Sequence, residues 1–348
     1  MRGTGGSGNS KCCVCDSQPA DAGSLACEHG FCHDCFGRYV NGSLDELSTR
    51  LRCCVCGACS RLAVETRDEA VAMSFGRDFP PRLRRPTSLA VRRRTGEFVL
   101  VDRASERVLV FDANGLISAD FAYVYDTLPM TGLTVTDDDC IVVPARDRGY
   151  RCLSFYTLDG AFLRSTYVAA DAVIEGVAVA PGDWLVVADS ANACVHLIDD
   201  RRRFIRSASV DQQPGDAHRP RLAGVAVNSV GEIIVSDSAN DCVRVLDADA
   251  RWRFSVGRRG ERPAQFNCPR GVAVDADDNI LVADSRNNRV QELSATGKFR
   301  RYVVRYNRGD DVYMSPTDVA TRADGSVAVL MTGVRDSDVG EVRIYASV

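Results

Sequence analysis

The chain has 348 residues, of which 45% are hydrophobic and 26% charged, and its formal net charge is −4. This length predicts about two domains of ordinary globular composition. No apolar run approaches the roughly 18 residues of a membrane span, which excludes a membrane partner. Residues 1–10 are rich in Gly and Ser without an apolar core, so we expect a flexible tail and a cytoplasmic protein, with the nucleus as the alternative.

The next segment, residues 11–60, contains eight potential metal ligands in four close pairs. They are Cys12 and Cys15, Cys27 and His29, Cys32 and Cys35, and Cys53 and Cys56. A closed structural zinc site takes four sulfur or nitrogen ligands, so this set predicts two Zn²⁺ ions. Cys56 and Cys59 also have the C-x2-C spacing, so the last pair has an alternative.

After a linker over residues 61–69, the sequence repeats. Similar four-residue frames begin at Ser88, Gly132, Gly176, Gly224, Gly271 and Asp318, and their last residues are 44, 44, 48, 47 and 47 positions apart. A fixed period of 40 to 50 residues with short β runs is typical of a propeller or solenoid.

Each repeat contains four short strand signals separated by turn residues. In the fifth repeat the predicted strands are 271–275, 280–283, 289–293 and 299–304. Four such strands make one antiparallel blade, so six repeats predict an all-β six-bladed propeller over residues 70–348. Only five fourth strands follow the six repeats, and we expect residues 70–76 to pair with the last blade and close the ring, which removes an exposed sheet edge.

Two segments resemble known modules. The fifth repeat, residues 266–290, resembles the NHL repeat, and the run Cys27-Glu28-His29-Gly30-Phe31-Cys32-His33-Asp34-Cys35 resembles a RING finger, a small zinc-bound α+β fold. The combination is similar to RING–NHL ubiquitin ligases of the malin-like and TRIM-NHL-like kind, although the chain has no B-box and no coiled coil.

The resemblance implies roles for particular residues. Cys12, Cys15, Cys32 and Cys35 would hold one zinc ion, and Cys27, His29, Cys53 and Cys56 the other. Val14 and Phe36 would dock a ubiquitin-conjugating enzyme, and no residue would act as a covalent catalyst. Two positions depart from the family pattern, because Cys54 stands where Pro is frequent and Gly57 where a basic residue is frequent.

The propeller is expected to have one basic face. The loops that join fourth to first strands and second to third strands share one end of the blades and are rich in Arg, including Arg258, Arg259, Arg262 and Arg286. Such a face suits an acidic segment of a protein substrate or the phosphates of single-stranded RNA; the alternative is a solvated rim.

Two functions therefore compete: a ubiquitin ligase that recruits its substrate through the propeller, and an RNA-binding regulator. A propeller enzyme is a weaker third alternative, because the sequence contains no recognisable site motif. His196 and His218 are interpreted as isolated. Cys194 and Cys242 are expected to be packing residues at the head of a third strand, where the first and fifth repeats have Arg107 and Arg289.

Overall fold

The computed structural model describes residues 50–52, 59–61, 71–77, 82–123, 132–147, 149–199, 201–305, 314–333 and 340–346. The chain divides into two compact units, Met1–Arg67 and Asp68–Val348. The eight predicted zinc ligands lie outside the described residues, as do Val14, Phe36 and the predicted tail.

The described part of the first unit is a short antiparallel hairpin. Strand β1 (Arg50–Arg52) pairs with β2 (Cys59–Arg61), and Arg52 lies opposite Cys59. The predicted ligands Cys53 and Cys56 belong to the segment that connects these two strands. Cys59, the alternative ligand, is part of β2.

The second unit is a six-bladed propeller, and each blade is a four-stranded antiparallel sheet. Blade 1 contains β4 (Pro86–Val91), β5 (Phe98–Asp102), β6 (Arg107–Phe111) and β7 (Ile117–Ala122), and blade 2 contains β8 (Thr134–Val135), β9 (Ile141–Asp147), β10 (Tyr150–Tyr156) and β11 (Phe162–Ala169). Blade 3 contains β12 (Ile174–Ala180), β13 (Trp184–Asp189), β14 (Cys194–Ile198) and β15 (Phe204–Ser209), and blade 4 contains β16 (Leu222–Val227), β17 (Ile233–Asp237), β18 (Cys242–Leu246) and β19 (Trp252–Val256). Blade 5 contains β20 (Pro269–Val274), β21 (Ile280–Asp284), β22 (Arg289–Leu293) and β23 (Phe299–Arg305), with a 3-10 turn at Ser285–Asn287.

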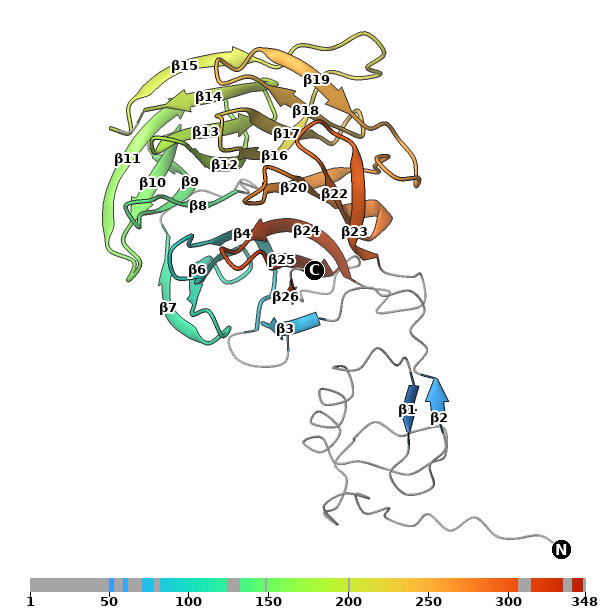
Figure 1. The fold of residues 1–348 in the computed structure, drawn as a ribbon. Coiled ribbons are helices and arrows are strands. Elements are labelled where there is room, and N and C mark those ends of the chain that lie inside the picture. Colours follow the sequence, from blue (N-terminus) through green and yellow to red (C-terminus); the bar gives the residue numbers. More distant parts are fainter. Residues whose placement is uncertain are drawn as a thin grey trace, which may run out of the picture. The chain divides into compact units, whose positions relative to one another are not determined.

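Blade 6 is assembled from the two ends of the unit. It consists of β24 (Met314–Thr321), β25 (Val327–Gly333), β26 (Gly340–Tyr345) and, as the outer strand, β3 (Val71–Phe75). Val342 pairs with Phe75, and Tyr345 pairs with Val71. This is the pairing that the count of fourth strands predicts, and it leaves each blade with four strands. Figure 1 shows β3 beside β26.

The burial pattern explains why these segments form blades. Second and third strands such as β13 and β14 are apolar and buried along almost their whole length, whereas the outer strand β15 is mostly exposed. Buried side chains from neighbouring blades pack in shared clusters; Val186 and Leu197 of blade 3, for example, pack with Val225 and Val235 of blade 4. Burial of these apolar side chains between sheets is the main stabilising contribution. In the part of the chain that the structure describes, no helix has the length and apolar character to cross a membrane.

Candidate functional site

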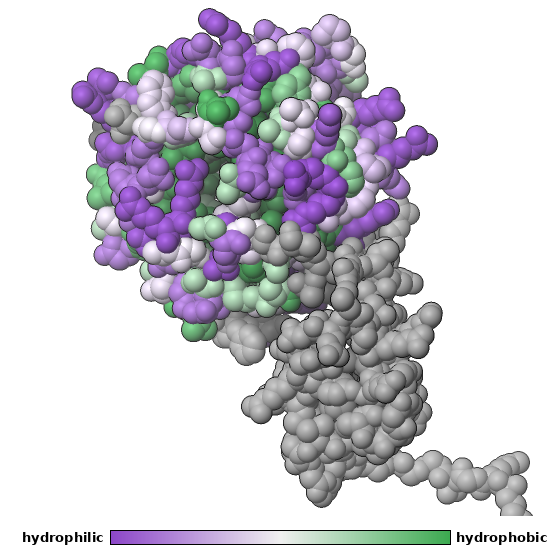
Figure 2. Space-filling view, in the orientation of Figure 1, coloured by the Kyte–Doolittle hydropathy of each residue, from purple (hydrophilic) through white to green (hydrophobic). Residues whose placement is uncertain are grey.

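The inner strands β4, β8, β12, β16, β20 and β24 meet around the centre of the propeller (Figure 1). They enclose a cavity of about 610 Å³, which all six blades line. A cavity of this size, bounded by several elements, is the usual form of a ligand site. Hydrophilic side chains dominate the propeller face seen in Figure 2, with smaller hydrophobic areas between them.

The glycines of the repeat frames lie where adjacent inner strands approach one another. A Cβ atom added at Gly224 would lie 2.6 Å from the carbonyl oxygen of Arg270, and one added at Gly271 would lie 2.5 Å from the Cα atom of Asp318. Real Cβ atoms do not come so close to backbone, so only glycine permits this spacing. The repeat frame therefore sets the width of the cavity.

Asp318 occupies the glycine position in blade 6. Its Oδ2 accepts hydrogen bonds from the Ser88 hydroxyl at 3.0 Å and the Leu89 N–H at 2.9 Å, and its Oδ1 accepts one from the Val319 N–H at 2.9 Å. Burial raises the pKa of Asp318 to about 6, although these hydrogen bonds favour the carboxylate.

A buried aspartate ends the second strand in four of the blades and fixes the loops at one mouth of the cavity. These residues are Asp102, Asp189, Asp237 and Asp284. Asp237 Oδ1, for example, accepts hydrogen bonds from the Arg221 N–H in the preceding loop at 3.0 Å and from the Ala239 N–H in the next loop at 3.1 Å. The loops that join fourth to first strands are thereby fastened to those that join second to third strands, as the sequence predicts for loops that share one end.

Four arginines line the cavity at this mouth: Arg103, Arg221, Arg270 and Arg286. All four are exposed, and among the described residues their guanidinium groups make no hydrogen bond or ion pair. Their backbones are fixed, since the N–H of Arg103 donates to Arg85 O at 3.0 Å and that of Arg286 donates to Asn267 O at 3.1 Å. We call this set the arginine mouth. It presents positive charge on anchored residues and suits an anionic ligand.

The opposite end of the blades differs, because several of its arginines are paired within the protein. Arg92 contacts Glu97 and Asp139, and Arg202 contacts Asp138 and Asp183. Hydrogen bonds and charges from Asp139 and Glu97 raise the pKa of Arg92.

Other acids at this end cap turns. Asp275 Oδ1, for example, accepts the N–H groups of Asp277 at 2.9 Å and Asn279 at 2.8 Å. Acidic side chains at this end are therefore partly engaged in contacts within the protein.

The structure places the predicted face residues at the same end but separates them. Arg286 lines the cavity, whereas Arg258, Arg259 and Arg262 lie in the loop between β19 and β20 and do not line it. Arg103, Arg221 and Arg270 also belong to the predicted Arg-rich face, but the sequence does not distinguish them as the arginines that line the cavity.

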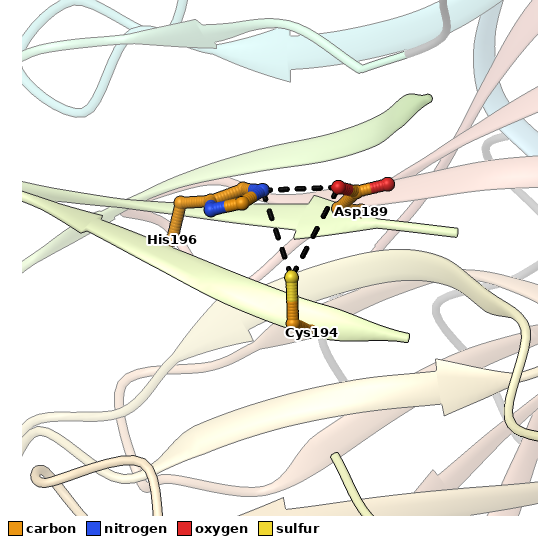
Figure 3. A group of neighbouring side chains, drawn as sticks. All are labelled: Asp189, Cys194 and His196. Carbon is orange, nitrogen blue, oxygen red and sulfur yellow. Dashed lines mark hydrogen bonds and ion pairs between the residues drawn. The ribbon is translucent and has the colours of Figure 1, made fainter. Parts of the chain in front are cut away.

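The interpretation of His196 as isolated is wrong. His196 Nε2 lies 3.1 Å from Asp189 Oδ2 and 3.7 Å from Cys194 Sγ (Figure 3). His196 Nδ1 lies 2.8 Å from the Ser207 hydroxyl. Alignment of the repeats could have indicated this cluster. Asp189, Cys194 and His196 occupy the positions at which blade 5 has Asp284, Arg289 and Gln291.

The cluster of Asp189, Cys194 and His196 does not have the arrangement of a thiol nucleophile. A relay would use one imidazole nitrogen for the thiol and the other for the carboxylate, but here Nε2 faces both. Burial and the charge of Asp189 raise the pKa of Cys194 to about 12. Burial also raises the pKa of Asp189, but hydrogen bonds, with the one from His196 foremost, outweigh it and hold that pKa below its usual value.

Comparisons with known proteins agree with the fold. The NHL repeat family model matches residues 266–293, which lie in blade 5, and no curated protein matches the chain. A protein of unknown function from Bacteroides thetaiotaomicron is 14% identical with a TM-score of 0.60, over 77% of this chain and 71% of that one. Catalytically inactive virginiamycin B lyase from Staphylococcus aureus with quinupristin is 11% identical with a TM-score of 0.56, over 78% and 88% of the two chains. A streptogramin B lyase structure is 10% identical with a TM-score of 0.56, over 78% and 96%.

These likenesses show the fold alone: the second unit is an all-β six-bladed propeller that carries an NHL repeat. The identities are too low to carry a function from one propeller to another.

Proposed function

We propose that the protein is a RING-type ubiquitin ligase that recruits its protein substrate through the NHL propeller. The observation that carries the recruiting role is the arginine mouth, whose four guanidinium groups have no partner among the described residues. The ligase role rests on the eight-ligand register of residues 12–56 and on its resemblance to a RING finger.

The proposed ligase works without a nucleophile of its own. Two Zn²⁺ ions would hold residues 11–60 in shape, and Val14 and Phe36 would dock a conjugating enzyme that carries ubiquitin as a thioester. A substrate lysine then attacks that thioester, and the rate gain comes from positioning the two reactants. This reaction takes place in the cytoplasm in our proposal.

The arginine mouth favours an acidic peptide segment as the bound part of the substrate. Guanidinium groups form two parallel hydrogen bonds with a carboxylate, so anchored arginines bind Asp and Glu side chains with defined geometry. The cavity behind the mouth also has apolar walls, contributed by side chains such as Leu89, Val177 and Val272, which would accept an apolar residue beside the acidic ones.

The direct test is discharge of ubiquitin from a panel of charged conjugating enzymes to free lysine, with the reduced full-length protein. Free lysine is the better acceptor because the chain itself contains only Lys11 and Lys298. We expect the wild type to accelerate discharge from at least one enzyme and Val14→Arg to abolish the acceleration. A wild type that accelerates none of the panel would overturn the proposal.

The same unpaired arginines favour a second candidate, a regulator that binds single-stranded RNA. Phosphate contacts release counterions, so RNA binding should weaken steeply as salt increases. We would compare a single-stranded RNA and an acidic peptide on the wild type, Arg221→Ala/Arg270→Ala and Arg258→Ala/Arg259→Ala.

Loss of RNA binding in both double variants, with a steep salt dependence, supports the RNA function. Loss of peptide binding in the first variant alone supports substrate recruitment at the arginine mouth. Arg206→Ala, an exposed arginine on the outer strand β15, is the control for general loss of charge.

A further inference from the structure

A buried cluster in blade 3, away from the arginine mouth, has the composition of a metal site. Asp189 ends β13, and Cys194 and His196 lie two residues apart on β14, so the three side chains meet between neighbouring strands (Figure 3). Each is less than a tenth exposed. Carboxylate, thiolate and imidazole are the three ligand types that zinc takes in proteins.

The spacing of the three ligand atoms fits one ion. Asp189 Oδ2 lies 3.1 Å from His196 Nε2 and 3.9 Å from Cys194 Sγ, and Sγ lies 3.7 Å from Nε2. Ligand atoms about 2.0 to 2.3 Å from one zinc ion at tetrahedral angles are separated by roughly 3.3 to 3.8 Å. The side chains therefore need only small shifts to surround an ion.

The surrounding hydrogen bonds hold two of the ligands as metal sites require. His196 Nδ1 faces the Ser207 hydroxyl at 2.8 Å, which leaves Nε2 to face the centre of the cluster. Asp189 Oδ1 accepts N–H groups from Val173 at 3.0 Å and Ala191 at 3.0 Å. Oδ2 accepts one from the Asn192 side-chain amide at 2.8 Å and also faces His196 Nε2. Such partners orient ligands and tune their basicity in known sites.

The neighbouring blades supply an independent argument, because they place a cation at the equivalent point. In blade 4, Arg244 Nε lies 3.0 Å from Asp237 Oδ2, and in blade 5, Arg289 Nε lies 2.8 Å from Asp284 Oδ2. Blade 3 has the same buried aspartate, but Cys194 and His196 stand at the two positions from which those arginines reach. Blade 3 therefore has the buried aspartate but lacks the arginine that pairs with it in blades 4 and 5, and a bound cation would supply the missing positive charge.

We propose that Asp189, Cys194 and His196 bind one divalent zinc ion, which takes the place of the arginine of the adjacent blades. Binding displaces the Cys194 thiol proton to solvent and forms bonds to Sγ, Nε2 and Oδ2, with water as the fourth ligand of a three-residue site. The ion clamps β13 to β14 and, through Asp189, holds the loop that precedes β12.

Zinc content of the full-length reduced chain, measured by native mass spectrometry after exposure to zinc and removal of weakly bound metal, tests this inference. The wild type should carry one more zinc ion per chain than Cys194→Ser. Addition of zinc should also raise the melting temperature of the wild type by more than it raises that of Cys194→Ser.

The matched control is Cys242→Ser. Cys242 occupies the equivalent position in blade 4 and is similarly buried, but the adjacent aspartate is already paired with Arg244, so this variant should keep the wild-type zinc content. If Cys194→Ser does not fold, His196→Asn replaces it, with the same expected loss of one ion.

Equal zinc content in the wild type and both blade 3 variants would overturn the inference. A loss of zinc in Cys242→Ser as well would also overturn it. The result does not depend on the N-terminal ligands, because only the difference between variants in the propeller is used.

Discussion

The Asp318 carboxylate accepts hydrogen bonds from the hydroxyl of Ser88 at 3.0 Å and the N–H of Leu89 at 2.9 Å, and so joins the last blade to the first. Ser88 and Asp318 are 230 positions apart in the chain. Between blades 4 and 5 the inner strands instead approach backbone to backbone at Gly224, and between blades 5 and 6 Gly271 leaves room for the Asp318 side chain. The ring is therefore closed by a buried polar contact on the inside and by β3 on the outside.

Asp318→Asn tests the inner contact through its pH dependence. Folding raises the pKa of Asp318 from 3.8 to about 6, so the folded state binds this proton more tightly than the unfolded state. Its stabilising contribution is therefore complete below about pH 4 and is lost as pH rises through 6. The free energy of unfolding of the wild type, minus that of Asp318→Asn, should fall by about 3 kcal/mol between pH 4 and 7. Urea unfolding of both proteins measures this difference, and a constant difference would contradict the expectation.

Gly271→Ala should destabilise the propeller, because the added Cβ would lie 2.2 Å from Asp318 Oδ1 and 2.5 Å from Asp318 Cα. Overpacking of this kind costs about 1 to 3 kcal/mol. The control is Gly176→Ala, whose Cβ would meet nothing nearer than Val225 N at 3.0 Å. In thermal unfolding, the melting temperature of Gly271→Ala should be lower than that of Gly176→Ala. The reverse order would refute the role proposed for the glycines of the repeat frames.

Arg244→Met should be among the most destabilising substitutions at a buried position, because it removes the guanidinium group that two carboxylates contact. Arg244 is fully buried and contacts Asp216 and Asp237, both at 2.6 Å. Removal of one member of a buried ion pair costs about 3 to 5 kcal/mol.

Arg206→Met is the matched control for that change, since Arg206 is exposed and lies 3.9 Å from an exposed Asp249 carboxylate. Its cost should stay below about 1 kcal/mol. Similar midpoints for the two variants in urea would count against the buried network.

Deletion of residues 68–80 tests the outer closure. This deletion removes β3, whose Phe75 packs against the rings of Phe98 and Phe111 with centroid separations of 5.1 and 4.8 Å. Without β3, the backbone hydrogen-bonding edge of β26 and the rings of Phe98 and Phe111 are exposed. We therefore expect the propeller to unfold or to aggregate through the free edge. A circular dichroism melt equal to that of the intact chain would show that the strand is dispensable.

The sequence was sufficient to predict the architecture, because each repeat encodes one blade. The four-residue frame forms the inner strand, and turn residues separate the other three strands. The missing fourth strand at the C-terminal end even indicated the partner of β26. The arginine mouth was only partly predictable. The loop positions show at which end of the blades an arginine lies, but they do not show whether it forms an ion pair within the protein, as Arg92 does.

His196 shows the corresponding limit of local sequence reasoning. Its partners Asp189 and Ser207 are not neighbours along the strand, and they meet it only through the register of β13, β14 and β15. An alignment of the six repeats by position would have revealed that His196 and Cys194 replace the arginines that neutralise the equivalent aspartates.

The zinc content of residues 11–60 tests the central claim most directly, and Cys194→Ser is the protein in which to measure it, because any ion in blade 3 is then absent. We predict two zinc ions per chain in reduced, full-length Cys194→Ser, one lost on changing Cys32 and Cys35 to Ser and the other on changing Cys53 and Cys56 to Ser. A chain without stoichiometric zinc, or one that keeps both ions after all four changes, would contradict the ligase proposal.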